Sequence, residues 1–145
     1  MPVYVDGKFH LFYTFLHKED AGAPGVLKGL DWARVVTQDF VHFEERGIAI
    51  ARGDESEPDL LVGAGSVIQI GGSEFAAYYG GINPKRGQVG EPDQVVLRAF
   101  SRDLDTWVKD TDFCLKSSDP YEVNDWRDPS VYREAGLWRM LLCTR

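Results

Sequence analysis

The segment best suited to chemistry is "NDWRDPSVY", residues 124–132. It places Arg127 and Asp128 side by side, between Trp126 and Pro129. A guanidinium can donate two parallel hydrogen bonds and a carboxylate can accept several, so the pair is suited to binding the hydroxyl groups of a polyol. The alternative is an ordinary surface ion pair at a turn, because Asp-Pro is a common turn former.

The composition is that of a globular domain and argues against some classes of partner. The chain has 145 residues, of which 43% are hydrophobic and 27% charged, as expected for one globular domain with a real core. Sixteen Lys and Arg against 23 Asp and Glu give a net charge of -7, which argues against nucleic acid and anionic membranes as partners. No apolar run reaches the roughly 18 residues of a membrane span and no signal-peptide pattern opens the chain, so a cytoplasmic location is the default expectation.

Cysteine and histidine indicate no metal site. The two cysteines, Cys114 and Cys143, have no CxxC pattern and no histidine at ligand spacing, so we expect two separate buried thiols. His10, His17 and His42 are scattered and suggest no catalytic triad. Neither a metal nor an organic cofactor is expected.

Short apolar and aromatic runs, broken by Gly, Asp and Pro, predict an all-β chain. An Asp-Gly pair predicts a tight hairpin between the first two strands. A loop rich in Gly and Pro is expected over residues 82–93. The predicted strands are 2–5, 8–15, 30–37, 41–45, 65–70, 74–81, 94–101, 106–110, 127–132 and 136–145.

The predicted strands form an internal repeat. Two sets of residues match between the first and second copies, one with a shift of 66 residues and one with a shift of 64. A third copy begins at "RDPSVY" and continues through "GLWRMLLCTR". The matched positions are Phe9, Phe12 and Tyr13 with Phe75, Tyr78 and Tyr79, then Thr37, Asp39, Phe40 and Phe43 with Ser101, Asp103, Leu104 and Trp107; Trp138, Leu141 and Leu142 repeat the first three.

A repeat of four antiparallel strands is typical of propeller blades. We therefore predict a partial β-propeller of about two blades plus the start of a third, over residues 1–50, 62–115 and 126–145. These copies do not close a ring, so we expect this chain to be a piece of a longer protein, or a short chain whose copies assemble into a ring. Blades without neighbours expose apolar faces, which predicts self-association.

The repeat contains a shared segment, [ST]-x-D-[FL]-x-x-[FW]. Asp39 and Asp103 are predicted to accept hydrogen bonds from turn amides between the third and fourth strands. Phe43 and Trp107 are predicted to fill the seams between blades. A β-sandwich is the alternative fold, but it does not explain why this segment recurs.

Several motifs together resemble glycoside hydrolase family 32, the invertase, levanase and fructanase group. They cover essentially the whole chain in the family's order: "GKFHLFYTF", "DWARVVTQDFVHFEERGIAI", "GAGSVI", "DWRDPSV" and "GLWRMLLCTR". The resemblance implies a five-bladed propeller, often followed by a β-sandwich, so the chain would be a partial five-bladed propeller. Five copies need roughly 320 residues, which makes the chain a piece of a longer hydrolase by this resemblance. It also implies hydrolysis of β-fructosyl bonds with retention of configuration, without a cofactor and on a carbohydrate substrate.

The resemblance assigns one catalytic role within the chain. Asp128 would stabilise the transition state, and Arg127 would hold Asp128 ionised and bind a sugar hydroxyl. The nucleophilic aspartate would fall before Met1 and the acid/base glutamate beyond Arg145, so the 145-residue chain alone is expected to be inactive. Retaining hydrolysis needs two carboxyl groups about 5 to 5.5 Å apart. Asp31, Asp125 and Glu57 are poor substitutes for the two missing acids, because the repeat directs none of them into the central channel as it does Asp128.

Substrate-binding positions differ from the family pattern. Thr14 stands where many relatives have a glutamine, Ala64 where they have a serine and Arg34 where they have a histidine, which leaves the sugar open. Trp32 and Trp126 are candidates for stacking on a sugar ring, or for packing in the core. Two other functions stay open: a propeller enzyme acting on arabinans, xylosides or mannosides, and a non-catalytic carbohydrate-binding or interaction scaffold.

Overall fold

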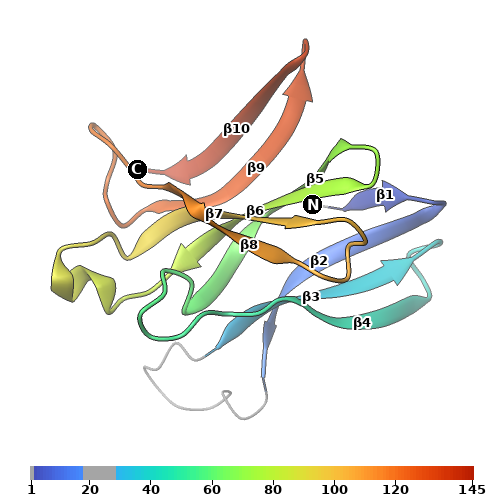
Figure 1. Cartoon of the computed structure of the whole chain (residues 1–145), viewed down its shortest axis with the longest axis horizontal. Helices are drawn as coiled ribbons and strands as arrows, with labels where there is room; N and C mark the ends of the chain where they lie inside the picture. The colour runs from blue at the N-terminus through green and yellow to red at the C-terminus, as the bar shows by residue number, and fades with distance from the viewer. Residues whose placement is uncertain (1, 18–28) are drawn as a thin grey trace.

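The computed structural model describes residues 2–17 and 29–145. The range predicted for the first blade also contains Met1 and residues 18–28, which lie outside the described part. The described chain forms three antiparallel sheets (Figure 1). The strands are β1 (Val3–Val5), β2 (Lys8–Leu16), β3 (Leu30–Thr37), β4 (Phe43–Ile50), β5 (Leu61–Gly71), β6 (Glu74–Ile82), β7 (Gln94–Ser101), β8 (Val108–Leu115), β9 (Trp126–Glu134) and β10 (Leu137–Thr144).

Two sheets have four strands each, in sequence order, and the third is the hairpin of β9 and β10. The predicted Gly- and Pro-rich loop contains a short 3-10 helix, η2 (Arg86–Val89). The fourth strands begin at Phe43 and Val108, later than predicted, because the turn before each strand continues for two further residues. Each sheet is a simple meander, as expected for one propeller blade.

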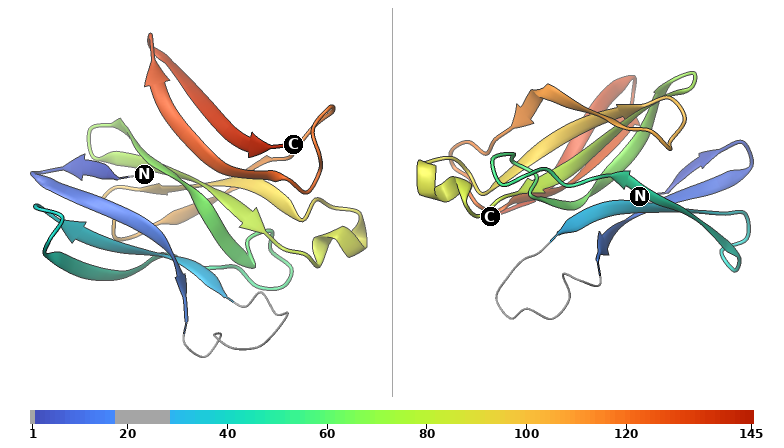
Figure 2. Two further views of the ribbon diagram at one scale, coloured as in Figure 1. Left: turned by 180° about the vertical axis from the view of Figure 1, so that it is seen from behind. Right: turned by 60° about the horizontal axis from the view of Figure 1, so that its bottom comes forward.

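The sheets lie beside one another and are not stacked as a sandwich. Strand β9 packs alongside β5, and the amide of Val131 donates a hydrogen bond to Ser66 Oγ at 2.9 Å. The left view of Figure 2 shows the β9–β10 hairpin projecting from the two larger sheets. The prediction of a partial β-propeller is therefore confirmed, and the alternative of a β-sandwich is wrong.

The core lies mainly between the first two sheets. Trp32 and Ile50 from the first sheet pack with apolar residues of β5, β6 and β7. Phe12 meets Trp107 edge to face, with ring centroids 5.7 Å apart. Trp107 therefore fills a seam between blades, as predicted.

Phe43, the repeat partner of Trp107, does not fill a seam. Its residue exposure is 51%, because the described chain has no sheet on that side of the first blade. The prediction that both thiols are buried is also wrong. Cys114 on β8 and Cys143 on β10 are free and exposed, since both strands lie at the edge of their sheets.

The repeated turns are built in the same way in both blades. Asp39 Oδ1 accepts hydrogen bonds from the amides of Val41 and His42 at 2.9 and 2.8 Å. Asp103 Oδ1 accepts equivalent bonds from Asp105 and Thr106 at 2.9 and 2.7 Å. Both aspartates therefore have the predicted structural role.

The residue after each turn aspartate has a left-handed backbone. Phe40 has φ 59° and Leu104 has φ 65°. Such angles are uncommon for residues other than glycine, so other contacts must hold them. Thr37 Oγ1 accepts a hydrogen bond from Phe40 N at 2.9 Å, and Ser101 Oγ accepts one from Leu104 N at 2.8 Å.

We expect Asp103→Ala to lower the free energy of unfolding by about 1 kcal/mol, because two turn amides lose their acceptor. Urea denaturation of the chain measures this change. Asp112→Ala, at an exposed position on β8, is the matched control and should have little effect. Equal effects of the two substitutions would contradict the assigned role of Asp103.

The His42 side chain, which lies 2.7 Å from Asp39, is the largest of the hydrogen-bond contributions that lower the pKa of Asp39 to about 2. The folded-state value lies below the ordinary value of 3.8, so the contribution of Asp39 to stability is present above about pH 4 and is lost as the pH falls toward 2. We expect His42→Ala to raise the pKa of Asp39, as measured by NMR titration of its carboxyl carbon. Asp103 should not respond, and an unchanged Asp39 pKa would contradict this assignment.

Candidate functional site at the starts of the inner strands

The first strands of the three sheets, β1, β5 and β9, begin at the same end of the structure. Trp32 Nε1, on the first sheet, donates a hydrogen bond to Gly63 O near the start of β5 at 2.8 Å. The amide of Trp126, at the start of β9, donates to Gln94 Oε1 at 3.3 Å, and Gln94 pairs with Ile82 at the same end of the second sheet. In a propeller such strands line the central channel, so this end is the candidate site.

Asp128 lies in a β-bulge. Arg127 pairs with Cys143 and Ser130 with Leu141, so Asp128 and Pro129 together oppose the single residue Leu142. Asp128 has φ 55°, in the left-handed region that Asp tolerates better than most residues. Bulges redirect side chains and are frequent near active sites. The Asp128 side chain is 49% exposed and thus open to a ligand.

Strand β9 begins at Trp126, one residue before the predicted start at Arg127. Asp128 is therefore the third residue of the strand. Pro129, which has no amide hydrogen, occupies the second position of the bulge, where the ladder is already interrupted. The buried Pro129 ring therefore fixes the backbone directly after the carboxylate.

Arg127 is held mainly by Asp125, and the predicted pairing with Asp128 is secondary. Arg127 Nη1 lies 2.5 Å from Asp125 Oδ1, whereas its Nε lies 3.8 Å from Asp128 Oδ2, too far for a hydrogen bond. Asp125 Oδ2 also contacts Arg145 Nε at 2.9 Å. The buried Asp125 is thus bridged by two arginines, which leaves the Asp128 carboxylate available.

Thr14 and Ala64, two of the predicted substrate contacts, are both exposed and lie toward the same end. Thr14 pairs with Trp32 in the β2–β3 ladder. Ala64 directly follows Gly63, which accepts the Trp32 hydrogen bond. The surface between the first two blades therefore presents small side chains at this end.

The two tryptophans are packed in the structure. Trp32 is only 3% exposed and lies in the core against Tyr79, with ring centroids 6.0 Å apart. Trp126 is 8% exposed and stacks near Tyr121. Both tryptophans therefore pack in the core, the alternative given in the sequence analysis, and neither presents an open ring face for stacking on a sugar.

Trp126 leaves one polar atom unused. Its Nε1 is buried and has no hydrogen-bond partner among the described residues.

The other carboxylates considered from the sequence have structural partners. Asp31 is buried, lies 2.6 Å from His17 Nε2 and accepts a hydrogen bond from the Arg52 amide at 2.6 Å. Glu57 Oε2 accepts one from the Asp54 amide at 3.0 Å. Neither is placed as a second catalytic acid beside Asp128.

A buried ionic cluster at the seam between the first two blades was missed by the sequence analysis. Arg34, 3% exposed, forms an ion pair with Asp105 of the second blade and lies 2.9 Å from His10 Nδ1. Burial, followed by the nearby charge of Arg34, lowers the pKa of His10. Arg34 is therefore a packing residue here. The repeat was a signal that could have indicated a structural role for Arg34, since Arg98 occupies the same position in the second blade.

A second buried cluster fixes the start of β5. Asp59 accepts a hydrogen bond from Tyr79 Oη at 3.0 Å and contacts Lys109 Nζ at 2.7 Å. Burial is the main cause that raises the pKa of Tyr79, which keeps the phenol protonated. The cluster joins the segment before β5 to β6 and β8, and so positions Ala64 indirectly.

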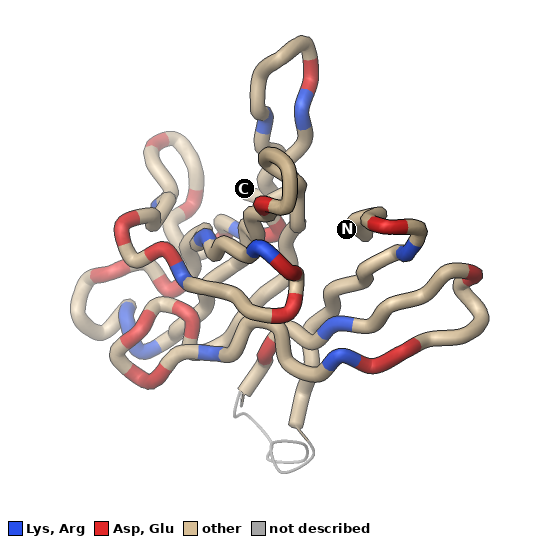
Figure 3. Tube along the Cα trace, turned by 45° about the vertical axis from the view of Figure 1, so that its right-hand side comes forward, with Lys and Arg blue, Asp and Glu red and all other residues tan. Residues whose placement is uncertain are grey.

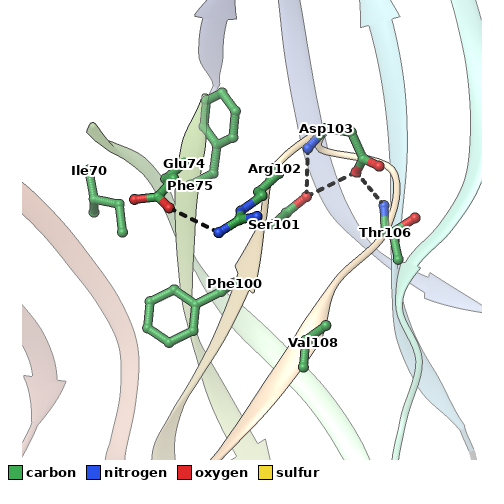
Figure 4. Close-up of a pocket in the computed structure, with 9 residues that line it drawn as sticks. All are labelled: Ile70, Glu74, Phe75, Phe100, Ser101, Arg102, Asp103, Thr106 and Val108. Carbon is green, nitrogen blue, oxygen red and sulfur yellow. Dashed lines mark hydrogen bonds and ion pairs between the residues drawn. The ribbon is translucent and has the colours of Figure 1, made fainter. Parts of the chain in front are cut away.

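A pocket of about 600 Å³ lies at the opposite end of the second sheet (Figure 4). It is lined by the adjoining ends of β5, β6, β7 and β8 and by the β7–β8 turn, and it includes the Glu74–Arg102 ion pair. None of the predicted sugar contacts lines it, so it is a separate feature.

Charges of both signs are interspersed along the described chain (Figure 3). Within residues 2–17 and 29–145, no group of three or more His, Cys, Asp or Glu side chains is arranged to hold a metal ion. The same residues contain no helix with the length and apolar character needed to cross a bilayer.

We expect Asp125→Ala to lower the free energy of unfolding by about 1 to 2 kcal/mol, because both bridged arginines lose a buried partner. Asp128→Asn should change it by less than about 0.5 kcal/mol, since Asn also tolerates the left-handed backbone. Chemical denaturation of both variants measures the difference. A larger loss for Asp128→Asn would show that Asp128 is primarily a folding residue.

Solved structures share this architecture. Sucrose-6-phosphate hydrolase from Lactobacillus gasseri matches with a TM-score of 0.75 and 19% identity, covering 96% of this chain and 26% of that one. Fructan 1-exohydrolase IIa from Cichorium intybus matches with a TM-score of 0.73 and 22% identity, covering 97% and 26%. The fold is thus part of a five-bladed β-propeller, as predicted.

Curated relatives agree with the structural match. The levanbiose-producing levanase of Bacillus subtilis is 29% identical over 137 residues, covering 90% of this chain and 24% of the relative. A sucrose-6-phosphate hydrolase of Escherichia coli is 26% identical over 141 residues, covering 97% and 28%. The chain spans about a quarter of the length of these relatives.

The sequence also matches the family described as glycosyl hydrolases family 32 N-terminal domain, over residues 1–145. The chain belongs to glycosyl hydrolase family 32.

Proposed function

We propose that the protein carrying this chain hydrolyses β-fructosyl bonds with retention, and that Asp128 stabilises the transition state. The observation that carries the proposal is the exposed Asp128 carboxylate, held in a bulge at the start of the third inner strand. Membership of family 32 over the whole chain supports the reaction class. Relatives named levanase, raffinose invertase and sucrose-6-phosphate hydrolase agree with it.

Asp128 would act through hydrogen bonds to two sugar hydroxyls. As the glycosidic bond breaks, the ring flattens and positive charge develops on it. A fixed carboxylate then interacts more strongly with the transition state than with the substrate, which is the condition for catalysis. The bulge and the buried Pro129 hold the carboxylate in place, so that little reorganisation is needed.

Arg127 would bind a neighbouring hydroxyl or support the sugar beside Asp128. The structure holds Arg127 through Asp125, so the Asp128 oxygens are not used up by an internal ion pair. The buried Asp125 thus acts as a positioning residue for Arg127. Trp126 Nε1, which has no hydrogen-bond partner among residues 2–17 and 29–145, is a further donor close to the site in sequence.

The exposed Thr14 and Ala64 would form part of the substrate surface between the first two blades. Both side chains are small and one is apolar, so they offer fewer hydrogen bonds than the glutamine and serine expected from the family pattern. Two neighbours of known structure contain fructosyl sugars: sucrose in an enzyme from Bombyx mori and 1-kestose in the Cichorium intybus enzyme. We propose a fructosyl sugar of this class as the substrate.

The other two acids of the family mechanism would come from outside residues 1–145. Such a site requires the remaining blades, supplied by a longer polypeptide or by an assembly. In the alternative, a non-catalytic carbohydrate-binding scaffold, Asp128 would bind sugar but the assembled blades would not hydrolyse it.

In a polypeptide that carries this chain with the remaining blades, we expect Asp128→Asn to reduce kcat on sucrose or inulin by about 10²- to 10³-fold. Released fructose measures the rate, and circular dichroism checks folding. Glu134→Gln, at the far end of β9, is the matched control and should retain activity. An unchanged rate in Asp128→Asn would remove Asp128 from the mechanism.

For the 145-residue chain alone, we expect no measurable hydrolysis of sucrose or inulin, because nucleophilic and acid/base catalysis each contribute several orders of magnitude. The same fructose assay tests this expectation. Turnover that disappears in Asp128→Asn would instead reveal a complete site assembled from several copies of the chain.

A further inference from the structure

His10 lies in the seam between the first two blades, at a position where the repeat does not place a second histidine. Phe12, two residues further along β2, packs against Trp107 of the second blade, and alternate residues of a strand share one face of the sheet. With the repeat shift of 66 residues, His10 falls on Ala76 in the second blade. The histidine is therefore a feature of this seam and not of the blade pattern.

A hydrogen bond from Arg34 fixes the protonation state of the His10 imidazole. Arg34 Nη1 lies 2.9 Å from His10 Nδ1. A guanidinium has only donors, so Nδ1 accepts this bond and carries no proton. The ring is neutral in this arrangement, with its proton on Nε2.

The His10 ring is nevertheless within reach of solvent. It is half-buried and lines two surface pockets of about 230 and 330 Å³. A proton can therefore reach Nδ1 when the hydrogen bond to Arg34 opens. The imidazolium that forms has a donor on each nitrogen and cannot accept a bond from Arg34.

Arg34 has little to replace the lost contact. It is 3% exposed, and its Nε is buried without a hydrogen-bond acceptor among residues 2–17 and 29–145. Its Nη2 donates to Asp105, on the β7–β8 turn of the second blade. Protonated His10 would place a second positive charge beside this buried guanidinium, and the two cations would share Asp105.

The environment of His10 favours its neutral form. The charged side chains around the two pockets are the carboxylates of Asp6, Asp103 and Asp105 and the cations of Lys8, Arg34, Arg46 and Arg102. Burial is the main cause that lowers the pKa of His10, followed by the charge of Arg34, with smaller contributions from Arg46 and Lys8. Asp105 acts in the opposite direction and raises the pKa.

The direction of the pKa change sets the pH range in which the seam responds. The folded-state pKa of His10 lies below the ordinary value of 6.5, which is the value of an unfolded chain. The unfolded chain therefore binds more protons than the folded chain as the pH falls. The stability that neutral His10 contributes is complete above about pH 6.5 and is lost as the pH decreases from there toward the folded-state pKa.

We propose that the His10–Arg34 hydrogen bond is a pH-sensitive contact that holds the β7–β8 turn of the second blade on the first blade, and that protonation of His10 releases this turn. The release is local to this end of the seam. At the other end, Trp32 Nε1 donates to Gly63 O, a bond that involves no titratable group. The inference concerns the packing of the two blades and does not depend on the proposed sugar hydrolysis.

The first measurement is the protonation state of His10 in the 145-residue chain. Long-range ¹H–¹⁵N NMR spectra distinguish the two neutral tautomers, and a pH titration gives the pKa. We expect the Nε2–H tautomer above pH 7 and a pKa below 6.5. Asp105→Asn should lower this pKa further, because the Asp105 carboxylate favours the imidazolium. Asp112→Asn, at an exposed position on β8, is the matched control and should leave it unchanged.

The second measurement is hydrogen exchange of the indole N–H groups. Trp107 Nε1 donates to Leu104 O in the β7–β8 turn at 3.1 Å, so its exchange reports local opening of the turn. Between pH 7 and pH 5, after correction for the intrinsic rate, we expect its protection to fall several-fold more in the unsubstituted chain than in His10→Gln. Glutamine supplies an acceptor for Arg34 that does not titrate. The Trp32 N–H is the internal control and should change equally in both proteins.

Several results would overturn the proposal. A His10 pKa at or above 6.5, an Nδ1–H tautomer, or an Asp105→Asn chain whose His10 pKa is unchanged or raised would each do so. So would a loss of Trp107 protection that is equally large in His10→Gln, or one that Trp32 shares, because the opening would then be global. If His10→Gln does not fold, the titrations of the unsubstituted chain and of Asp105→Asn decide.

Discussion

The structure depends on burial of the faces between neighbouring blades. A four-stranded meander has two faces and cannot cover both by itself, so its apolar side chains must pack on the next sheet. Here Trp32 is the central contact: its ring lies in the core, and its N–H donates to Gly63 O of the second blade. The same contact places the start of β5 beside the first sheet. The geometry of the candidate site is therefore a result of blade packing.

The repeat conserves backbone chemistry more closely than side-chain chemistry. The two turns use the same hydroxyl, the same carboxylate and the same left-handed residue, although Phe40 is exposed and Leu104 is buried. In contrast, Arg34 and Arg98 share a position but differ in their counterions. The counterion of Arg34 comes from the next blade, whereas that of Arg98 lies within its own blade.

The sequence predicted the fold well because periodic signals carry it. Alternating apolar residues, the Asp-Gly hairpin and the shared turn segment were enough to define the blades and to give Asp39 and Asp103 their correct roles. The fourth strands began later than predicted, because the length of the turn is set by hydrogen bonds that the alternation does not contain. Phe43 and the two cysteines were misplaced for a related reason: burial depends on whether a neighbouring sheet is present, and local pattern cannot show that.

The candidate site was predictable in position but less so in detail. The R-D-P motif located Asp128, yet its neighbour in sequence is not the main partner of Arg127, because the bulge separates their side chains. The bulge has a further consequence. It adds one residue to β9 relative to β10, so the alternation of side chains beyond Pro129 is set by the length of this segment. Loss of a single residue here would move Val131 off the face that meets Ser66, so the position of the exposed Asp128 carboxylate and the packing of the third blade depend on the same bulge.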